Sequence, residues 1–316
     1  MVWYSAVFVI CVILIATKLY HLLTKGWCRS KVCLVGKTVL VTGSNRGIGF
    51  ETALEFAKRG ARVILACRNL EYAAEAKDKI ISLTQNRNIV LKEVNLSSLK
   101  SIKNLADDIN KTEDRLDILV NNAGIGIIKN KTTEDGLQIL MQINYFAPVF
   151  LTLNLIDLLK KTGSSRIVLV SSMLAILGDL KNKNLNEYPG SNLKAYSNSK
   201  LALILFGRKL AKLLQGSGVS VYSLHPGVIK TNIFDKISKA YRTVFDVFVL
   251  CYFKTPEEGA QTTLHASLEP DLEEYSGGFF KECERTSFYR KARDDGLVDE
   301  VWQKTMDVLK IEKKFV

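Results

Sequence analysis

Two kinds of apolar pattern alternate along the chain after residue 37. Short, nearly continuous apolar runs predict strands buried on both faces, at Val39–Val41, Arg62–Ala66, Ile89–Val94, Leu116–Val120, Arg166–Val170 and Val219–Leu224. Apolar residues at helical spacing predict helices at Gly49–Arg59, Leu70–Leu83, a segment capped by Ser97 or Ser98, Asp135–Lys160, Leu193–Leu214 and a segment beginning at Thr255. Strands that alternate with helices predict one α/β domain over residues 37–316, with a doubly wound parallel sheet and helices on both faces.

The amino terminus has a different pattern. Val2–Thr17 carries no charge, and the apolar character resumes beyond Lys18 as far as Leu23. This span approaches the roughly 20 residues that a membrane helix needs, with Lys18 reaching towards the headgroups. We therefore expect an N-terminal transmembrane helix at residues 1–24. A cleaved signal peptide is the alternative, although neither a basic start nor a small-residue cleavage site is clear.

The net charge of +12 is concentrated beside this apolar segment. No acidic residue precedes Glu51, whereas the same span holds Lys18, Lys25, Arg29, Lys31, Lys37 and Arg46. This distribution favours a membrane surface as partner and does not favour nucleic acid. It predicts a basic linker at residues 25–36 and a globular domain on the cytoplasmic side. The six cysteines have no metal-ligand spacing, so we expect reduced thiols and no metal site.

A glycine-rich turn follows the first predicted strand. Gly43, Gly47 and Gly49 lie between that strand and an amphipathic helix. In this context the glycines let the backbone approach a pyrophosphate, and the N-terminal end of the helix faces its charge. The turn therefore predicts a Rossmann-type dinucleotide site. A tight turn without a ligand is the alternative.

Polar residues stand at the carboxyl ends of later strands. Asn121–Gly124, Ser172 and Pro226-Gly227 each follow a predicted strand, on the same edge of the sheet as the glycine turn. Tyr196 and Lys200 are four residues apart on a predicted helix, so both lie on one face. Alone, a tyrosine and a lysine at this spacing are common by chance and usually lie on an exposed surface without a catalytic role.

Together, T-G-S-N-R-G-I-G, N-N-A-G, a serine, Y-x-x-x-K and P-G, in this order, resemble the short-chain dehydrogenase/reductase family. The resemblance covers nearly all of residues 36–316. The stretches A-Y-S-N-S-K-L-A-L-I-L-F, S-L-H-P-G-V-I-K-T and F-K-T-P-E-E-G-A-Q-T-T-L-H-A are similar to the membrane-bound retinol dehydrogenase branch of that family.

The resemblance implies four catalytic residues. Tyr196 would be the general acid/base, and Lys200 with the oxidised nicotinamide would lower the pKa of its phenol. Ser172, in preference to Ser171, would hold the substrate oxygen near Tyr196, so these two residues would also bind substrate. Asn144 would complete a water-linked proton path from Lys200; an ordinary helix-interior amide is the alternative.

The resemblance also implies a set of cofactor contacts. They are Gly43, Asn45, Arg46, Gly47, Ile48, Gly49, Arg68, Asn95, Leu96, Asn122, Ala123, Gly124, Tyr196, Lys200, Pro226, Gly227, Val228 and Thr231. The second strand ends at Cys67-Arg68 without an acid, and Arg68 with Arg46 could pair with a 2′-phosphate. We therefore expect NADP(H) as the preferred cofactor, with NAD(H) possible.

Two positions depart from the family pattern. Asn95 stands where an aspartate usually contacts the adenine, which predicts a weaker contact. Ala147-Pro148 follows Asn144 where the branch tends to have Gly-His, and this proline should bend or break its helix. Residues 233–253, rich in Phe, Val, Tyr and Leu, would form a lid over an apolar substrate; a core or membrane-contacting helix is the alternative.

The sequence thus predicts a membrane-anchored NADP(H)-dependent oxidoreductase that interconverts a lipophilic alcohol and its carbonyl, with retinol and retinal first. Steroids, isoprenoids and lipid aldehydes are alternative substrates, and a non-catalytic cofactor-binding sensor or scaffold is the alternative function. We expect the endoplasmic reticulum as its membrane. The long helices from Asp135 and Leu193 could pair between the subunits of a homodimer.

Overall fold

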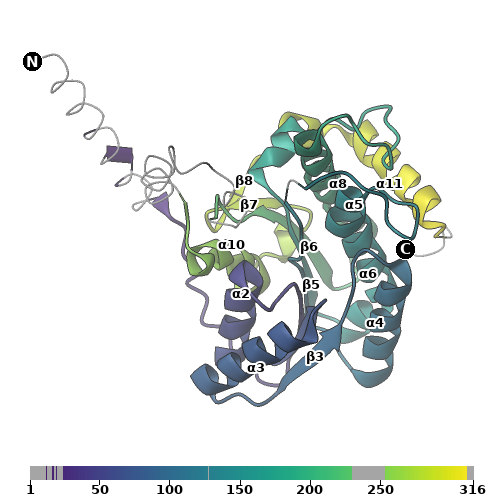
Figure 1. Cartoon of the computed structure of the whole chain (residues 1–316). Helices are drawn as coiled ribbons and strands as arrows, with labels where there is room; N and C mark the ends of the chain where they lie inside the picture. Colours follow the sequence, from purple (N-terminus) through teal and green to yellow (C-terminus); the bar gives the residue numbers. More distant parts are fainter. Residues whose placement is uncertain are drawn as a thin grey trace, which may run out of the picture.

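The computed structural model describes residues 24–126, 128–229 and 253–311, together with residues 12, 16, 17 and 19. One eight-stranded sheet runs through the middle of the domain, in the order β3-β2-β1-β4-β5-β6-β7-β8 (Figure 1). The strands are β1 (Thr38–Thr42), β2 (Arg62–Cys67), β3 (Ile89–Glu93), β4 (Ile118–Asn121), β5 (Ser165–Val170), β6 (Val219–His225), β7 (Phe279–Lys281) and β8 (Glu284–Thr286). The helices are α2 (Gly47–Lys58), α3 (Leu70–Thr84), α4 (Leu99–Thr112), α5 (Ile139–Met141), α6 (Ala147–Asn154), α7 (Ile156–Thr162), α8 (Asn192–Leu213), α10 (Pro256–Leu268) and α11 (Asp295–Leu309).

All six predicted strands are present, and they pair in parallel as expected. The chain winds outward from β1 in both directions, through β2 to β3 and through β4 to β7. Two strands were not predicted: β7 pairs in parallel with β6, and β8 pairs antiparallel with β7 at the edge. The prediction of a doubly wound sheet is confirmed, with an antiparallel edge strand added.

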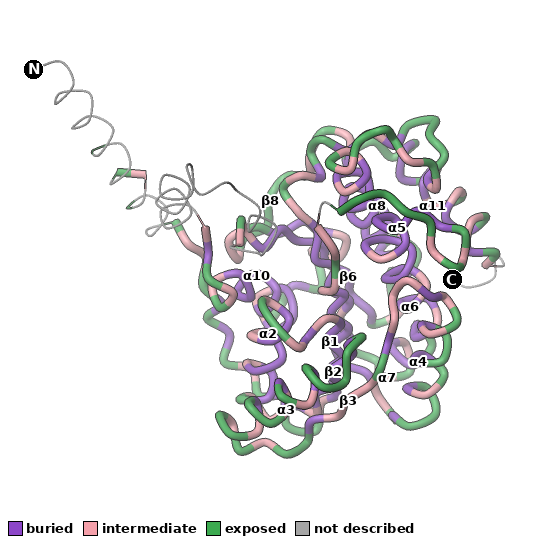
Figure 2. The backbone as a smooth tube through the Cα atoms, in the orientation of Figure 1, coloured by how far each residue is buried: buried purple, intermediate pink, exposed green. Residues whose placement is uncertain are grey.

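Helices cover both faces of this sheet. α2, α3 and α10 lie on one side, whereas α4, α6, α8 and α11 lie on the other (Figure 1). Each layer encloses its own apolar cluster, around Phe56 on the first side and around Phe206 on the second. Buried backbone follows the strands and the inward sides of the helices, which places the core on both sheet faces (Figure 2).

The helix ends follow the capping signals of the sequence. Gly60 has a φ of +84° after α2, and its N–H donates to the carbonyl of Ala57, so it is a left-handed cap. Thr255 and Glu258 form a capping box at the start of α10. Ser98, not Ser97, accepts the N-terminal hydrogen bond of α4.

The predicted helix over Asp135–Lys160 begins late and is interrupted in two places. Regular helix begins only at Ile139, after the Gln138 N-cap, and the carboxylate of Asp135 accepts the N–H of Leu99 at the start of α4. A π-helical turn, Gln142–Phe146, then separates α5 from α6, and α7 bends away from α6 by 53°. The expected distortion beside Pro148 is therefore present, since this residue has no N–H to donate to a carbonyl one turn earlier.

The last helix closes the outer surface of α8 and of the π-helical turn. Trp302 of α11 stacks on Phe206 of α8, with ring centroids 5.7 Å apart. The buried hydroxyls of Thr305 in α11 and Tyr145 in the π-turn are 2.6 Å apart. A homodimer formed through the two helices predicted from Asp135 and Leu193 would have to form around α11 or displace it.

Residues 25–36, which we name the strap, lie against α2 and α10. Their burial alternates, with Cys28, Ser30 and Leu34 inward and the residues between them outward or half-buried. The hydroxyl of Ser30 donates to the carbonyl of Leu268, and the guanidinium of Arg59 donates to the carbonyl of Ser30. The expected basic linker is thus packed along its length.

The predicted anchor at 1–24 and the predicted lid at 233–253 fall almost entirely outside the described residues. In the part of the chain that the structure describes, no single helix is long and apolar enough to cross a membrane. The bent pair Ile139–Asn154 and Ile156–Thr162 meets the length and composition required, but most of its residues belong to the core.

Candidate active site

Three elements bring the four expected catalytic residues to one corner of the sheet. Asn144 lies in the π-helical turn, Ser172 follows β5, and Tyr196 and Lys200 lie on α8. Gly124, after β4, is the meeting point: a Cβ added there would lie 3.2 Å from the Lys200 ammonium and 3.3 Å from the Asn144 carbonyl oxygen. A side chain at residue 124 would therefore press on both groups, and glycine lets the backbone after β4 enter this corner without displacing them.

The amide of Asn144 holds a loop and is not an ordinary helix-interior amide. Its carbonyl oxygen accepts the N–H of Ile125 at 2.8 Å, and its amide nitrogen donates to the carbonyl of Ile125 at 3.0 Å. The same nitrogen donates to the hydroxyl of Ser199 at 3.2 Å. This side chain, which is fully buried, therefore ties the loop after β4 to α8. Ser199 was not predicted as a supporting residue.

Lys200 has its charged group in the interior. Its ammonium donates to the carbonyl of Val170 at 2.9 Å, and the residue is almost fully buried. Burial disfavours the charged form and lowers the pKa of Lys200 to about 8. A proton on this lysine can thus be lost close to physiological pH.

The hydroxyl of Tyr196 has two influences of opposite sign. Burial raises the pKa of its phenol, and a hydrogen bond with Ser172 opposes that rise. The Lys200 ammonium lies 6.0 Å from the centre of the Tyr196 ring. The net pKa of Tyr196 is raised, and the lowering expected from Lys200 with oxidised nicotinamide stays a prediction.

The two adjacent serines after β5 have different surroundings. The Ser171 hydroxyl is buried and donates to the backbone carbonyl of Lys200 at 2.7 Å. The Ser172 hydroxyl accepts the N–H of Leu174 and reaches Tyr196, as the expected substrate-side position requires. Ser171 instead joins the end of β5 to α8.

His225 is buried and fixes the turn that follows Ser172. Its Nδ1 accepts the N–H of Met173 at 3.1 Å, so the described structure requires a neutral imidazole. Burial, with help from nearby lysines, lowers the pKa of His225 to about 4. The order of residues along the chain gave no signal for this contact.

The glycine turn and the Asn-Ala-Gly loop are fitted to each other. A Cβ on Gly43, whose φ is +65°, would lie 3.0 Å from Ala123. A Cβ on Gly49 would lie 2.5 Å from the amide nitrogen of Asn122, which itself donates to the carbonyl of Thr42. The Thr42 hydroxyl in turn accepts the N–H groups of residues 122 and 123. Glycine is required here because two backbones approach closely.

The first turn of α2 has the features of an anion site. Its N-cap, Arg46, makes no side-chain cap, and no acid lies in the first turn, whereas side chains cap α3, α4 and α10. A Cβ on Gly47 would enter open space. Backbone N–H groups and the positive helix end are therefore available to a phosphate, which fits the pyrophosphate of a dinucleotide. Arg46 and Arg68 are exposed, and within the described chain neither forms an ion pair.

The other expected cofactor residues vary in their surroundings. The side-chain oxygen of Asn95 accepts both the N–H and the hydroxyl of Ser97, so this amide shapes the start of α4. Leu96 packs on the core, and Val228 is exposed. Asn45 is half-buried in the glycine turn, while Thr231 lies outside the described residues.

Comparisons with known proteins agree with this geometry. The family model described as short chain dehydrogenase matches residues 37–242. Retinol dehydrogenase 11 of Mus musculus is 38% identical over 298 residues, covering 94% of this chain and 93% of its own length. Retinol dehydrogenase 12 of Homo sapiens is 38% identical over 301 residues, covering 94% of each chain.

Solved structures share the fold. An uncharacterized protein from Mycobacterium paratuberculosis has a TM-score of 0.73 and 28% identity, covering 91% of this chain and 98% of its own. A Pseudomonas aeruginosa RhlG/NADP active-site complex has a TM-score of 0.62 and 28% identity, covering 78% and 95%. The chain is an oxidoreductase of the short-chain dehydrogenase/reductase family and belongs to its retinol dehydrogenase-like branch.

Proposed function

We propose that this protein is a membrane-anchored, NADP(H)-dependent oxidoreductase that interconverts a lipophilic alcohol and its aldehyde or ketone. The main observation behind this proposal is that Ser172, Tyr196 and Lys200 lie together beside the N-terminal end of α2. That helix end has no side-chain cap and fits a dinucleotide phosphate. Retinol and retinal are the first substrates to test. Steroids, isoprenoid alcohols and lipid aldehydes come next.

In this proposal the nicotinamide supplies or accepts the hydride when it is bound. For reduction, the hydroxyls of Ser172 and Tyr196 hold the carbonyl oxygen, and Tyr196 gives it a proton. Lys200 lies against the same ring and favours the phenolate that remains. Asn144 keeps the loop at Gly124 in place beside Lys200, which supports a proton path towards that lysine.

Apolar side chains near Ser172 support a lipophilic substrate. Met173, Ile176 and Leu177 are all exposed in the segment that follows Ser172. Leu193, at the start of the helix that carries Tyr196, is also exposed. Apolar residues gathered beside a catalytic group favour a substrate with a large apolar surface.

The cofactor preference rests on charge. Arg46 and Arg68 are both free to pair with a 2′-phosphate, which NADP(H) has and NAD(H) lacks. Because cytosolic NADP is generally kept reduced, reduction of the carbonyl is the expected direction. The apolar amino terminus and its basic flank support a membrane anchor with the domain in the cytoplasm, and the endoplasmic reticulum is the first membrane to test.

The test is NADPH consumption by membranes that carry the full chain, with retinal and a panel of apolar ketones and aldehydes. NADH is measured in parallel, and Tyr196→Phe is the matched control because it removes only the phenolic hydroxyl. We expect that variant to lose activity by a factor of about 1,000, within the range of general acid–base catalysis.

A non-catalytic NADP(H) sensor or membrane scaffold is the other function that the fold allows. It would be favoured by a chain that binds NADPH but turns over none of these compounds. Turnover that survives Tyr196→Phe would instead contradict the assigned proton donor.

A further inference from the structure

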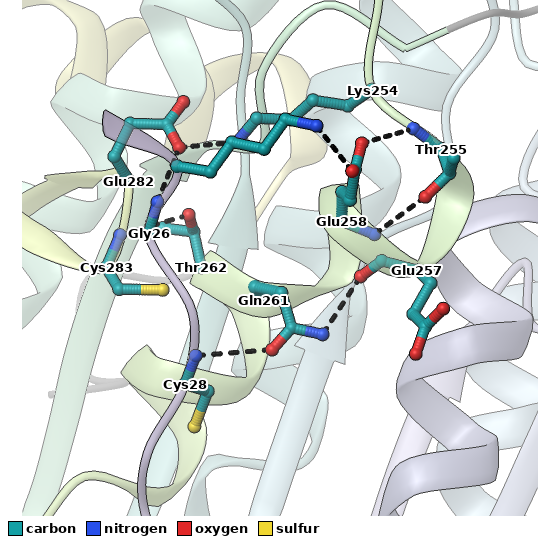
Figure 3. A network of polar contacts seen from close by, with 11 residues as sticks. Gly26, Cys28, Lys254, Thr255, Glu257, Glu258, Gln261, Thr262, Glu282 and Cys283 are labelled. Atoms are coloured by element: carbon teal, nitrogen blue, oxygen red, sulfur yellow. Dashed lines mark hydrogen bonds and ion pairs between the residues drawn. The ribbon is translucent and has the colours of Figure 1, made fainter. Parts of the chain in front are cut away.

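The carboxylate of Glu282 joins two segments that are far apart in sequence. Glu282 lies in the turn between β7 and β8, and one of its oxygens accepts from the Lys254 ammonium at 2.6 Å and from the N–H of Gly26 at 3.1 Å (Figure 3). Gly26 belongs to the strap, whereas Lys254 immediately precedes the cap of α10. One carboxylate therefore holds the strap and residue 254 together.

The side chain of Lys254 continues this connection to the Pro226-Gly227 turn. Gly227 has a φ of +97°, and a Cβ added there would lie 2.6 Å from the Cδ of Lys254. The N–H of Lys254 also donates to the carbonyl of Val228 at 2.8 Å. The position of this turn is thus set in part by where the lysine stem lies.

The strap fits closely against the turn that carries Glu282. A Cβ added to Gly26 would lie 1.9 Å from the carbonyl oxygen of Glu282, so only glycine fits there without movement. Glu282 and Cys283 both have positive φ, of 51° and 59°, which a hairpin turn normally assigns to Asn or Gly. A second ion pair, from Lys25 to Glu258 at the start of α10, fixes the strap beside it.

The ion pair of Lys254 and Glu282 is mostly withdrawn from solvent. The Lys254 side chain is 9% exposed and that of Glu282 is 26% exposed. A buried ammonium that loses its counter-ion is strongly disfavoured, so it would move towards water. That movement would take the lysine stem away from Gly227.

We propose that Glu282 is a positioning residue for cofactor binding. Through its ion pair with Lys254, Glu282 fixes the position of the Pro226-Gly227 turn. Through its hydrogen bond with Gly26, it makes the position of that turn depend on how the strap packs against the β7–β8 hairpin. The inference rests on the proposed function, because it takes this turn to contact NADP(H).

The experiment measures NADPH binding by fluorescence on the full chain in detergent, without any turnover. The variants are Glu282→Gln, which removes the charge, and Gly26→Ala, which pushes the strap off the hairpin without changing charge. We expect each to raise the dissociation constant about fivefold or more, a factor typical of coupling between sites. The KM for NADPH should rise with it, while kcat at saturating NADPH changes less than about twofold.

Two controls separate this effect from loss of stability. Asp299→Asn breaks another ion pair of 2.6 Å, with Lys209 on the far layer. Gly36→Ala strains the other glycine of the strap, where an added Cβ meets nothing. Neither should change NADPH affinity, whatever it does to the melting temperature. The double variant Lys254→Met/Glu282→Gln removes both charges and should bind no more weakly than Glu282→Gln.

The results distinguish the positioning role from the proposed function. If the wild type binds NADPH and both Glu282→Gln and Gly26→Ala bind it equally well, only the positioning role is overturned. That role is also overturned if Asp299→Asn weakens binding as much as Glu282→Gln does. If the wild type binds no NADPH, the proposed function and this inference fail together.

Discussion

The catalytic corner, around Asn144 and Lys200, and the cofactor edge, around Arg46 and Arg68, differ in how firmly their side chains are held by the rest of the protein. In the corner, Asn144 and Lys200 are buried, and their polar atoms are held by neighbouring backbone and side chains. At the edge, Arg46 and Arg68 extend into solvent, and no ion pair restrains them within the described residues. We therefore expect substitution of Asn144 or Lys200 to change kcat and stability together, and substitutions at the edge to change cofactor affinity alone.

The largest effect should come from Lys200→Met. This variant should reduce kcat by a factor of about 1,000, since the phenolate of Tyr196 loses its only close cation among the described residues. It should also raise the free energy of unfolding by about 2 kcal/mol at pH 7, because an ammonium is no longer buried. Carbonyl reduction assays measure the change in kcat, and denaturant unfolding measures the change in stability. A variant less stable than the wild type would show that the buried ammonium does not destabilise the fold.

The stability gain of Lys200→Met should depend on pH. The wild-type lysine is charged in the folded and unfolded states below its folded pKa of about 8, so the cost of burial is fully present there. Between pH 8 and its unfolded value near 10.4 only the unfolded state stays protonated, and the cost is relieved as pH rises. Unfolding curves should therefore show the difference between variant and wild type shrinking over this range. A constant difference would contradict the lowered pKa.

The two adjacent serines offer the next test of the corner. Ser172→Ala should reduce kcat about 100-fold with little change in stability, because its hydroxyl faces Tyr196 and the substrate side. Ser171→Ala should cost about 1 kcal/mol of stability, since its hydroxyl bonds a buried carbonyl of α8, and leave most activity in place. Parallel kinetics and thermal unfolding measure both effects; the reverse result would exchange the two roles.

At the edge, Arg46→Ser/Arg68→Ser should weaken NADPH binding about 30-fold. Each arginine removed costs one charge-assisted contact with the 2′-phosphate, whereas NADH should bind as before. Titrations of both cofactors measure the ratio directly. Equal losses for NADPH and NADH would place the arginines at the shared pyrophosphate, and no loss would make them solvated surface charges.

His225 should give the smallest effect at neutral pH, because its contribution is confined to acid. Its folded pKa of about 4 lies below the unfolded value near 6.5, so its contribution to stability is present above pH 6.5 and is lost as pH falls towards 4. His225→Gln should remove this dependence and flatten the acid limb of stability by up to about 3 kcal/mol, the difference between the two pKa values converted to free energy, with almost no change at pH 7. Thermal unfolding between pH 4 and 7 is the measurement. If the variant loses stability in acid as the wild type does, that loss comes from other groups.

Sequence patterns were sufficient wherever one local rule decided the structure. The buried strands β1 to β6, the cap at Gly60 and the box at Thr255 each follow from apolar runs or capping chemistry within a few residues. The position of Ser172 followed from the rule that parallel strands place their carboxyl ends at one edge, whereas its grouping with Tyr196 and Lys200 came from the resemblance to the family.

Features that depend on distant partners were not accessible in this way. β7 and β8 are three residues each, too short for a periodic pattern, and they form because β6 offers a free edge. The contact of His225 with Met173 joins residues 52 apart in sequence. The packing of the strap likewise needs α2 and α10 to exist first.

The π-helical turn at Gln142–Phe146 has a consequence for insertions and deletions. A π-turn holds one residue more than an α-turn, and each residue of a helix advances its side chains by about 100°. Deleting a single residue in this turn would therefore swing Asn144 away from Ile125 while leaving α6 intact. In an alignment of proteins that share this fold, a gap of one residue at this turn would distinguish those that can place an amide beside the loop after β4 from those that cannot.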